Sequence, residues 1–171
     1  MTISGIPRLR TPVIALAAAL VLAFAATLSA RAGPAGQPVY LMRHLPQADE
    51  SSDSDLSDRG RAMGVKLAQA LGTVPFAAVF ATDTRRARQT AAVIAGPLGL
   101  ETRIYDPRRP ELLVAEAGAV EGPVLIVGHS NTAPDLARQF GASEEEAEKL
   151  ATFGQVGIAE GGEWRGLVLP D

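Results

Sequence analysis

Side chains suited to binding and attacking a phosphoryl group follow three apolar runs of the sequence. Arg43 and His44 come directly after the run "VYLM", and His129 follows the run "PVLIVG". A third run, "FAAVFA", is followed by Thr82 and, four residues later, by Arg86. Arginine makes bidentate contacts with phosphate oxygens, and histidine acts as a nucleophile in covalent catalysis. If the ends of these runs meet, they form a compact cationic site for a phosphoryl group.

These ends meet if the apolar runs are neighbouring parallel strands. Apolar runs alternate with amphipathic segments of helical period, which predicts an α/β fold with a mostly parallel central sheet and helices on both faces. A C-terminal hairpin, with its turn at Gly161 and Gly162, adds an antiparallel edge. Strands are expected at 39–42, 76–81, 102–105 and 123–128, the hairpin at 155–169, and helices at 58–71, 84–99, 111–120, 131–140 and 143–151.

In such sheets, ligands bind beyond the carboxyl ends of the strands. Arg86 lies in the first turn of one predicted helix and Asn131 at the start of another, so backbone N–H groups would add donors for the same anion. Nearby cations disfavour a protonated His44 and keep it able to attack phosphorus. Thr82, Ser130 and Asn131 are candidate substrate contacts, although Ser130 and Asn131 are equally typical of a helix cap.

These motifs and their order resemble the histidine phosphatase superfamily, which includes the phosphoglycerate mutases. Arg43 and His44 resemble its Arg-His-Gly motif, and His129 follows a glycine at a strand end, as the family's third motif does. The segment "RARQTA", 86–91, matches the family's Arg-Ala-x-Gln-Thr-Ala, and "LSDRG", 56–60, resembles its Leu-Thr-x-x-Gly segment. The resemblance extends from Gln37 to the C-terminus.

The resemblance implies hydrolysis of phosphomonoesters without a metal or another cofactor. His44 would form a phosphohistidine intermediate, while Arg43, Arg86 and His129 would bind the transferred group. The alternative is a non-catalytic module of the same fold that binds phosphate or a phosphorylated ligand.

That alternative is motivated by departures from the family pattern. Leu45 stands where the family has glycine, and its larger side chain is expected to narrow the approach to His44 or to alter the loop that follows. Thr82 and Asp83 stand in place of Ser-Pro, so Asp83 would bring a negative charge near the phosphate.

The family's general acid lies between its second and third motifs. Glu111 fits that position best, Asp106 is its rival, and a site without an internal acid is the third possibility. Larger members of the family insert a lid segment before the final histidine, whereas Glu111 and His129 are only 18 positions apart here, so the resemblance implies an open site. An open site suits an exposed phosphate on a large molecule, such as an envelope glycolipid, or a broad range of phosphomonoesters.

Composition limits the other classes of function. The chain has 171 residues, no cysteine and two histidines, so disulfides and multi-histidine metal centres are excluded. The net charge of −3, without a basic run, gives no support for nucleic-acid binding. Residues 1–32 follow the pattern of a secretory signal peptide, so we expect residues 37–171 to form an exported, periplasmic or extracytoplasmic domain. An uncleaved anchor is the alternative for 1–32 and the only predicted contact with a membrane.

Overall fold

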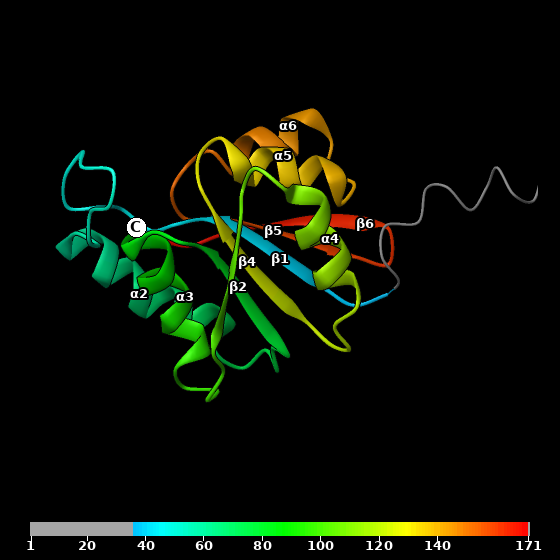
Figure 1. Cartoon of the computed structure of the whole chain (residues 1–171), viewed down its shortest axis with the longest axis horizontal. Helices are drawn as coiled ribbons and strands as arrows, with labels where there is room; N and C mark the ends of the chain where they lie inside the picture. Colours follow the sequence, from blue (N-terminus) through cyan, green and yellow to red (C-terminus); the bar gives the residue numbers. More distant parts are fainter. Residues whose placement is uncertain (1–35, 171) are drawn as a thin grey trace, which may run out of the picture. The chain divides into compact units, whose positions relative to one another are not determined.

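The computed structural model describes residues 36–170, so the predicted signal peptide lies outside the described residues. The described chain contains a six-stranded sheet with the order β3-β2-β4-β1-β5-β6 (Figure 1). Neighbours from β3 to β1 are parallel, whereas β5 pairs antiparallel with both β1 and β6. The predicted mostly parallel sheet is therefore confirmed. The strands are β1 Val39–Arg43, β2 Ala78–Thr82, β3 Thr102–Tyr105, β4 Val124–Gly128, β5 Gln155–Glu160 and β6 Glu163–Val168.

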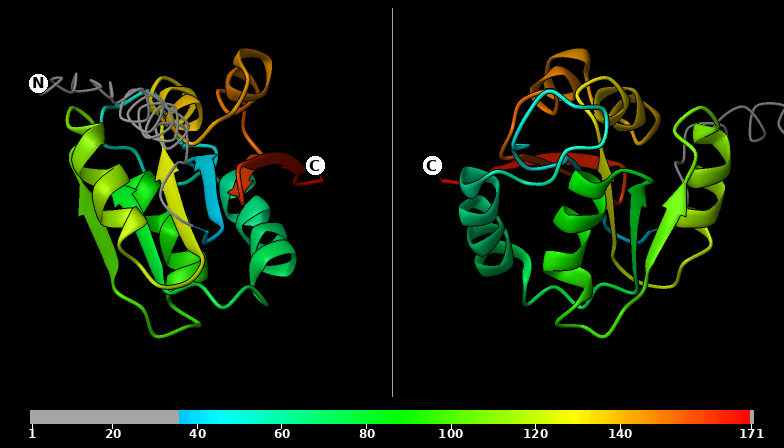
Figure 2. Two further views of the ribbon diagram at one scale, coloured as in Figure 1. Left: turned by 90° about the vertical axis from the view of Figure 1, so that its right-hand side faces the viewer. Right: turned by 60° about the vertical axis from the view of Figure 1, so that its left-hand side comes forward.

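Helices cover both faces of the sheet, as predicted. Leu67 and Ala91, from α2 and α3, belong to one apolar cluster, whereas Leu113, Leu136 and Ala147, from α4, α5 and α6, belong to a second. Figures 1 and 2 show α2 and α3 on one side of the sheet and α5 and α6 on the other. Every residue of β2 and β4 is buried because each strand has both faces covered. The helices are α2 Asp58–Leu71, α3 Arg85–Ala95, α4 Pro110–Gly118, α5 Thr132–Gln139 and α6 Glu144–Lys149.

The register of the parallel strands brings the predicted functional residues to one edge. Arg43 pairs with Gly128, and the backbone N–H of His44 donates to the carbonyl of Gly128 at 2.9 Å. Thr82 ends β2, whose other neighbour is β3. The carboxyl ends of β1, β4 and β2 therefore lie side by side at one edge of the sheet. The residues that follow these three strands are close to one another for the same reason.

The helices begin and end within two residues of the expected positions, with the exception of the end of α3. Helix α3 ends at Ala95 and not at residue 99, because Gly96 caps it and Pro97 has no N–H to continue the helical hydrogen bonds. Asn131 is the N-cap of α5, but its side chain makes no capping hydrogen bond. Ser57, in contrast, caps α2 by accepting a hydrogen bond from the N–H of Gly60 at 3.0 Å.

The C-terminal hairpin is confirmed. Gly161 and Gly162 join β5 to β6, and both have positive φ, +59° and +84°, as a two-residue turn of type I′ requires. Within residues 36–170, no helix has the length and apolar character needed to cross a membrane.

Candidate functional site

The strand ends bring four of the predicted residues into a connected set. The Nε of Arg86 donates to Nε2 of His44 at 3.2 Å, and the rings of His44 and His129 lie edge to face with centroids 5.1 Å apart. The hydroxyl of Thr82 is hydrogen bonded to Nε2 of His129 at 2.7 Å. The structure therefore joins β1, β2, β4 and the first turn of α3 through side chains that the sequence analysis selected.

The hydrogen bonds of His44 assign its tautomer. Nδ1 lies 2.8 Å from the carbonyl oxygen of Leu45, which accepts only, so Nδ1 carries the proton. Nε2 then holds the free electron pair and accepts from Arg86. His44 is 2% exposed, so backbone and neighbouring side chains hold its ring in this orientation.

Both site histidines are held neutral. Burial, together with the charges of His129, Arg86 and Arg43, lowers the pKa of His44 to about 4, although the hydrogen bond to Leu45 opposes the shift. Burial and the charges of Arg86 and Arg43 lower the pKa of His129 to about 4 as well. At neutral pH, His44 therefore presents an unprotonated nitrogen in a cationic environment, which is what attack on an anionic phosphoryl group requires.

Arg43 is held by a segment that the sequence analysis did not select. Its Nη1 donates to the carbonyl of Ala151 at 2.7 Å, and its guanidinium carbon lies 3.8 Å from the ring centre of Phe153. The ring of Phe153 also lies edge to face with His44, at 5.8 Å between centroids. The Nε of Arg43 is buried without a hydrogen-bond partner, so this donor is available to a ligand. Phe153 therefore helps to orient both Arg43 and His44.

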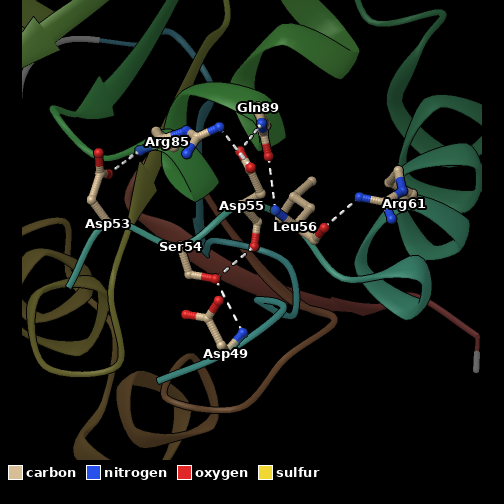
Figure 3. Close-up of polar contacts among 8 residues, drawn as sticks. All are labelled: Asp49, Asp53, Ser54, Asp55, Leu56, Arg61, Arg85 and Gln89. Atoms are coloured by element: carbon tan, nitrogen blue, oxygen red, sulfur yellow. Dashed lines mark hydrogen bonds and ion pairs between the residues drawn. The ribbon is translucent and has the colours of Figure 1, made fainter. Parts of the chain in front are cut away.

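The loop 44–57 is fastened to the start of α3 (Figure 3). Asp53 accepts from the backbone N–H of Arg85 at 2.7 Å, and Asp55 accepts from the Arg85 side chain at 2.6 Å. Gln89 donates to Asp55 at 2.6 Å and accepts from the N–H of Leu56 at 2.8 Å. Although its side chain is exposed, Arg85 therefore helps to position the loop beside the site.

Leu45 does not line the approach to His44. Its side chain has no exposed surface and belongs to the apolar cluster under α2 and α3, and its N–H donates to the hydroxyl of Thr90 at 3.0 Å. No non-glycine residue within 36–170 has a positive φ, so leucine is not strained at this position. The expectation that Leu45 narrows the approach is therefore wrong, because the side chain fills the core.

Asp83 is paired and lies outside the connected set. It forms an ion pair with Arg88 on the exposed side of α3. Its charge is therefore largely balanced by its neighbour.

The two candidate acids lie near the start of α4. Glu111 is in the first turn of that helix, and its exposed side chain pairs with Arg109 at 3.7 Å. Asp106 accepts hydrogen bonds from the side chain and the N–H of Arg108, which hold the pKa of this carboxyl below its usual range. Neither acid contacts His44, so the role of proton donor stays a prediction for both.

After β4, Thr132 makes the contact that the sequence analysis did not identify. Its hydroxyl accepts from the backbone N–H of His129 at 2.9 Å and so fixes the start of α5 against the strand. Ser130 and Asn131 are exposed between them and lie next to His129 in the chain. Across residues 36–170, no group of three or more His, Cys, Asp or Glu side chains is arranged to hold a metal ion.

Several solved structures of the same fold are named as phosphatases or candidate phosphatases. The mycobacterial glucosyl-3-phosphoglycerate phosphatase shares 17% identity with a TM-score of 0.61, covering 78% of this chain and 98% of that one. A candidate phosphohistidine phosphatase from Agrobacterium tumefaciens shares 20% identity with a TM-score of 0.60, covering 80% and 99%. A candidate α-ribazole-5′-P phosphatase from Escherichia coli K-12 shares 15% identity with a TM-score of 0.63, covering 79% and 97%.

A comparison with family models gives the assignment, whereas no curated protein matches the chain. The model of the histidine phosphatase superfamily (branch 1) matches residues 39–123. This range includes the Arg43-His44 pair at the end of β1 and the "RARQTA" motif at the start of α3. Because the match contains both motifs in the order and at the strand ends described above, the chain belongs to the histidine phosphatase superfamily.

Proposed function

We propose that the protein hydrolyses phosphomonoesters without a metal ion, through a phosphohistidine formed on His44. The observation that carries the proposal is the state of Nε2 of His44: it is unprotonated, faces Arg86 and lies in a cluster that also contains Arg43 and His129. Membership of the superfamily and the phosphatases among the structural neighbours support the same class of reaction.

Arg86 changes its hydrogen bond in the proposed first step. In the free protein, its Nε donates to Nε2 of His44, and Nη1 donates to the carbonyl of Ser52 at 2.7 Å. A bound phosphoryl oxygen accepts from Arg86 more strongly than a neutral imidazole does, because it is charged. Substrate binding therefore withdraws the Arg86 donor and leaves the electron pair of His44 free to attack.

The bonds and protons balance over two steps. Nε2 of His44 attacks phosphorus, the bond from phosphorus to the ester oxygen breaks, and that oxygen takes a proton to leave as the alcohol. Water then attacks the phosphohistidine, releases inorganic phosphate, and returns a proton to the site. Arg43, with its unpaired Nε, and His129 stabilise the charge on the phosphoryl oxygens in both steps.

Glu111 is the proposed proton donor for the leaving alcohol. Glu111 forms an ion pair with Arg109 at 3.7 Å, whereas Asp106 is hydrogen bonded to both the backbone N–H and the side chain of Arg108. The contacts of Asp106 favour its ionised form, so it is the weaker candidate. The acid has to approach the leaving oxygen only in the substrate complex, because catalytic contacts are often absent from the free enzyme.

The non-catalytic binding module remains a second candidate on one observation. Neither Glu111 nor Asp106 contacts the histidines, so the described site binds an anion without a proton donor in place. Under this alternative, Arg86→Ala abolishes phosphate binding, yet no phosphorylated His44 forms.

The two candidates are separated by turnover of p-nitrophenyl phosphate in the presence of a chelator. We expect hydrolysis by the full chain, inhibition by vanadate, no activity in His44→Ala, and a phosphorylated His44 peptide in acid-free mass spectrometry. A control, Arg165→Gln, changes an exposed residue of β6 and should retain full activity. Undiminished turnover by His44→Ala would refute the proposal, and phosphate binding without turnover would favour the binding module.

Export and substrate origin are part of the same proposal. We infer from the sequence of residues 1–32 that the domain acts outside the cytoplasm on an envelope glycolipid or another exposed phosphomonoester. N-terminal sequencing of the protein from cell fractions tests this, and an intact Met1 in a cytoplasmic fraction would contradict it.

A further inference from the structure

The arginines around the site are already paired with carboxylates. In the segments 83–88 and 106–111, which follow β2 and β3, every arginine except Arg86 has an acidic partner. An arginine beside the site could, if unpaired, bind a second anionic group of the substrate. Their pairs are Arg85 with Asp55, Arg88 with Asp83, Arg108 with Asp106 and Arg109 with Glu111.

Redirecting such an arginine toward a substrate would not change the local charge. Exposed ion pairs are weak, so Arg108 could leave Asp106 at little cost. The Asp106 carboxylate would then remain near the new anion without its partner. A second anionic group of the substrate therefore finds no net positive charge at these ion pairs. Arg43 and Arg86 cannot replace them, because both bind the phosphoryl group.

Unbalanced carboxylates surround the same strand ends. The segments 44–57, 83–88, 106–111 and 129–135 contain eight carboxylates and, apart from Arg86, four arginines. The segment 44–57 alone has four carboxylates and no lysine or arginine. Within it, Glu50 is near enough to Arg43 for its charge to oppose the lowering of the Arg43 pKa that burial and Arg86 cause. The rim of the site is therefore acidic around a cationic centre.

A small cavity beside His129 is also lined by a carboxylate. Its volume is about 50 Å³, and it adjoins the backbone of His129 through Thr132, whose hydroxyl accepts from the His129 N–H. Asp135 is its one charged lining residue, and Asp135 shares the guanidinium of Arg138 with two further carboxylates. The lining residues are Tyr105, Pro107, Pro110, Thr132, Asp135 and Leu136.

We propose that the site selects phosphomonoesters whose alcohol portion is uncharged or cationic, and that it disfavours substrates with a second carboxylate or phosphate. The phosphoryl group binds to Arg43 and Arg86, and the alcohol portion extends over the acidic rim toward the cavity at Asp135. This inference rests on the proposed phosphatase function and adds the substrate class. It accounts for both the ion-paired arginines and the excess of carboxylates at the strand ends.

Three esters of similar size test the selection. Glycerol 1-phosphate and 3-phosphoglycerate share a three-carbon chain and differ by a hydroxymethyl group against a carboxylate, and O-phosphoethanolamine supplies a cation. A carboxylate about 8 Å from one unbalanced rim charge should lower kcat/KM by roughly 3- to 30-fold, depending on the local dielectric. We expect the order O-phosphoethanolamine, glycerol 1-phosphate, 3-phosphoglycerate at about 20 mM salt, with the differences reduced several-fold at about 500 mM salt.

Variants assign the selection to the rim. Glu50→Gln combined with Asp135→Asn should reduce the preference for glycerol 1-phosphate over 3-phosphoglycerate by at least about threefold. Comparing the ratio of the two esters between enzymes removes the intrinsic reactivity of each ester. The matched control Glu163→Gln removes an exposed carboxylate from β6 and should leave the ratio unchanged.

The outcomes distinguish the inference from the proposed function. If all esters are cleaved and 3-phosphoglycerate is cleaved as well as glycerol 1-phosphate at low salt, the inference is wrong and the phosphatase stands. A preference that neither salt nor the double variant alters also overturns the inference. If neither these esters nor p-nitrophenyl phosphate is cleaved, the phosphatase proposal fails first and the inference fails with it.

Discussion

Acidification from about pH 7 to about pH 5 should destabilise the folded domain through the two site histidines. In the folded protein, burial and neighbouring cations lower the pKa of His44 and of His129 from 6.5 to about 4. In the unfolded chain, both side chains return to the ordinary value. Between about pH 6.5 and pH 4, the unfolded state therefore binds protons that the native state does not, and stability decreases as the pH falls. Below about pH 4, both states are protonated and this loss stops increasing.

The two pKa values set the size of the loss. For one histidine, the linkage relation gives about 2 kcal/mol between pH 7 and pH 5, so two independent sites would give about 4 kcal/mol. His129, Arg43 and Arg86 are only partly buried, and screening of their charges by solvent reduces the effect. We therefore expect about half, or roughly 2 kcal/mol in total, which is a large fraction of the stability of a domain of this size.

Urea denaturation of the full chain at the two pH values measures this loss. The carboxyl groups contribute equally to the wild type and to the double variant His44→Asn/His129→Asn, which removes both histidines of the chain, so the difference between the two proteins isolates the site. The wild type should lose roughly 2 kcal/mol more than the variant, and saturating inorganic phosphate should shrink this difference, because a bound dianion favours protonated histidine. Equal losses in the two proteins would refute the account of the neutral histidines.

Three further predictions concern residues around the site and at the edge of the sheet. Phe153→Leu removes the ring that covers Arg43 and should weaken the binding of inorganic phosphate about three- to fivefold, as measured by calorimetry, whereas Phe153→Tyr should restore the affinity. Unchanged affinity in Phe153→Leu would show that the ring does not orient Arg43. Gln89→Leu leaves a buried backbone N–H of the adjoining loop unpaired and should cost about 1–2 kcal/mol in urea denaturation, whereas a cost below about 0.5 kcal/mol would contradict this role. Gly157→Ala places a methyl group 2.1 Å from the ring of Trp164, so it should lower the free energy of unfolding by about 1–3 kcal/mol and shift the fluorescence spectrum of this single tryptophan. An unshifted spectrum would contradict the packing of Trp164 on Gly157.

The elements of the fold were predictable because each has a local signal. The runs that became β2 and β4 are apolar throughout, and a strand buried on both faces requires this pattern. Ser57 and the Gly161-Gly162 pair mark a helix start and a turn by their own chemistry. The strand order was not predictable in the same way, because which parallel strands become neighbours depends on contacts between residues far apart in the chain.

The phosphate-binding residues of the site could be predicted from the strand ends, whereas the residues that position them could not. Arg43 and His129 meet because parallel strands place their carboxyl ends at one edge of the sheet. Phe153 reaches Arg43 because β5 runs antiparallel to β1, so the start of β5 lies beside the end of β1. That pairing joins residues more than a hundred positions apart, and no local pattern around Phe153 indicates it. The hydrogen bond from the backbone N–H of Arg85 to Asp53 and its ion pair with Asp55 depend likewise on the path of the loop 44–57.

Leu45 shows where reasoning from a motif reaches its limit. Within a strand, side chains alternate between faces, and Leu41 and Met42 lie in opposite apolar clusters accordingly. Continued alternation would place Leu45 on the side of Leu41, but the strand ends at Arg43 and Leu45 joins the cluster of Met42 under α2 and α3. The direction of a side chain just beyond a strand is set by the turn of the backbone, which the residue type does not specify. The buried Leu45 side chain packs under the loop 44–57, whose Ser52 carbonyl accepts a hydrogen bond from Arg86. Leucine in place of glycine therefore stabilises the position of this loop and does not restrict access to His44.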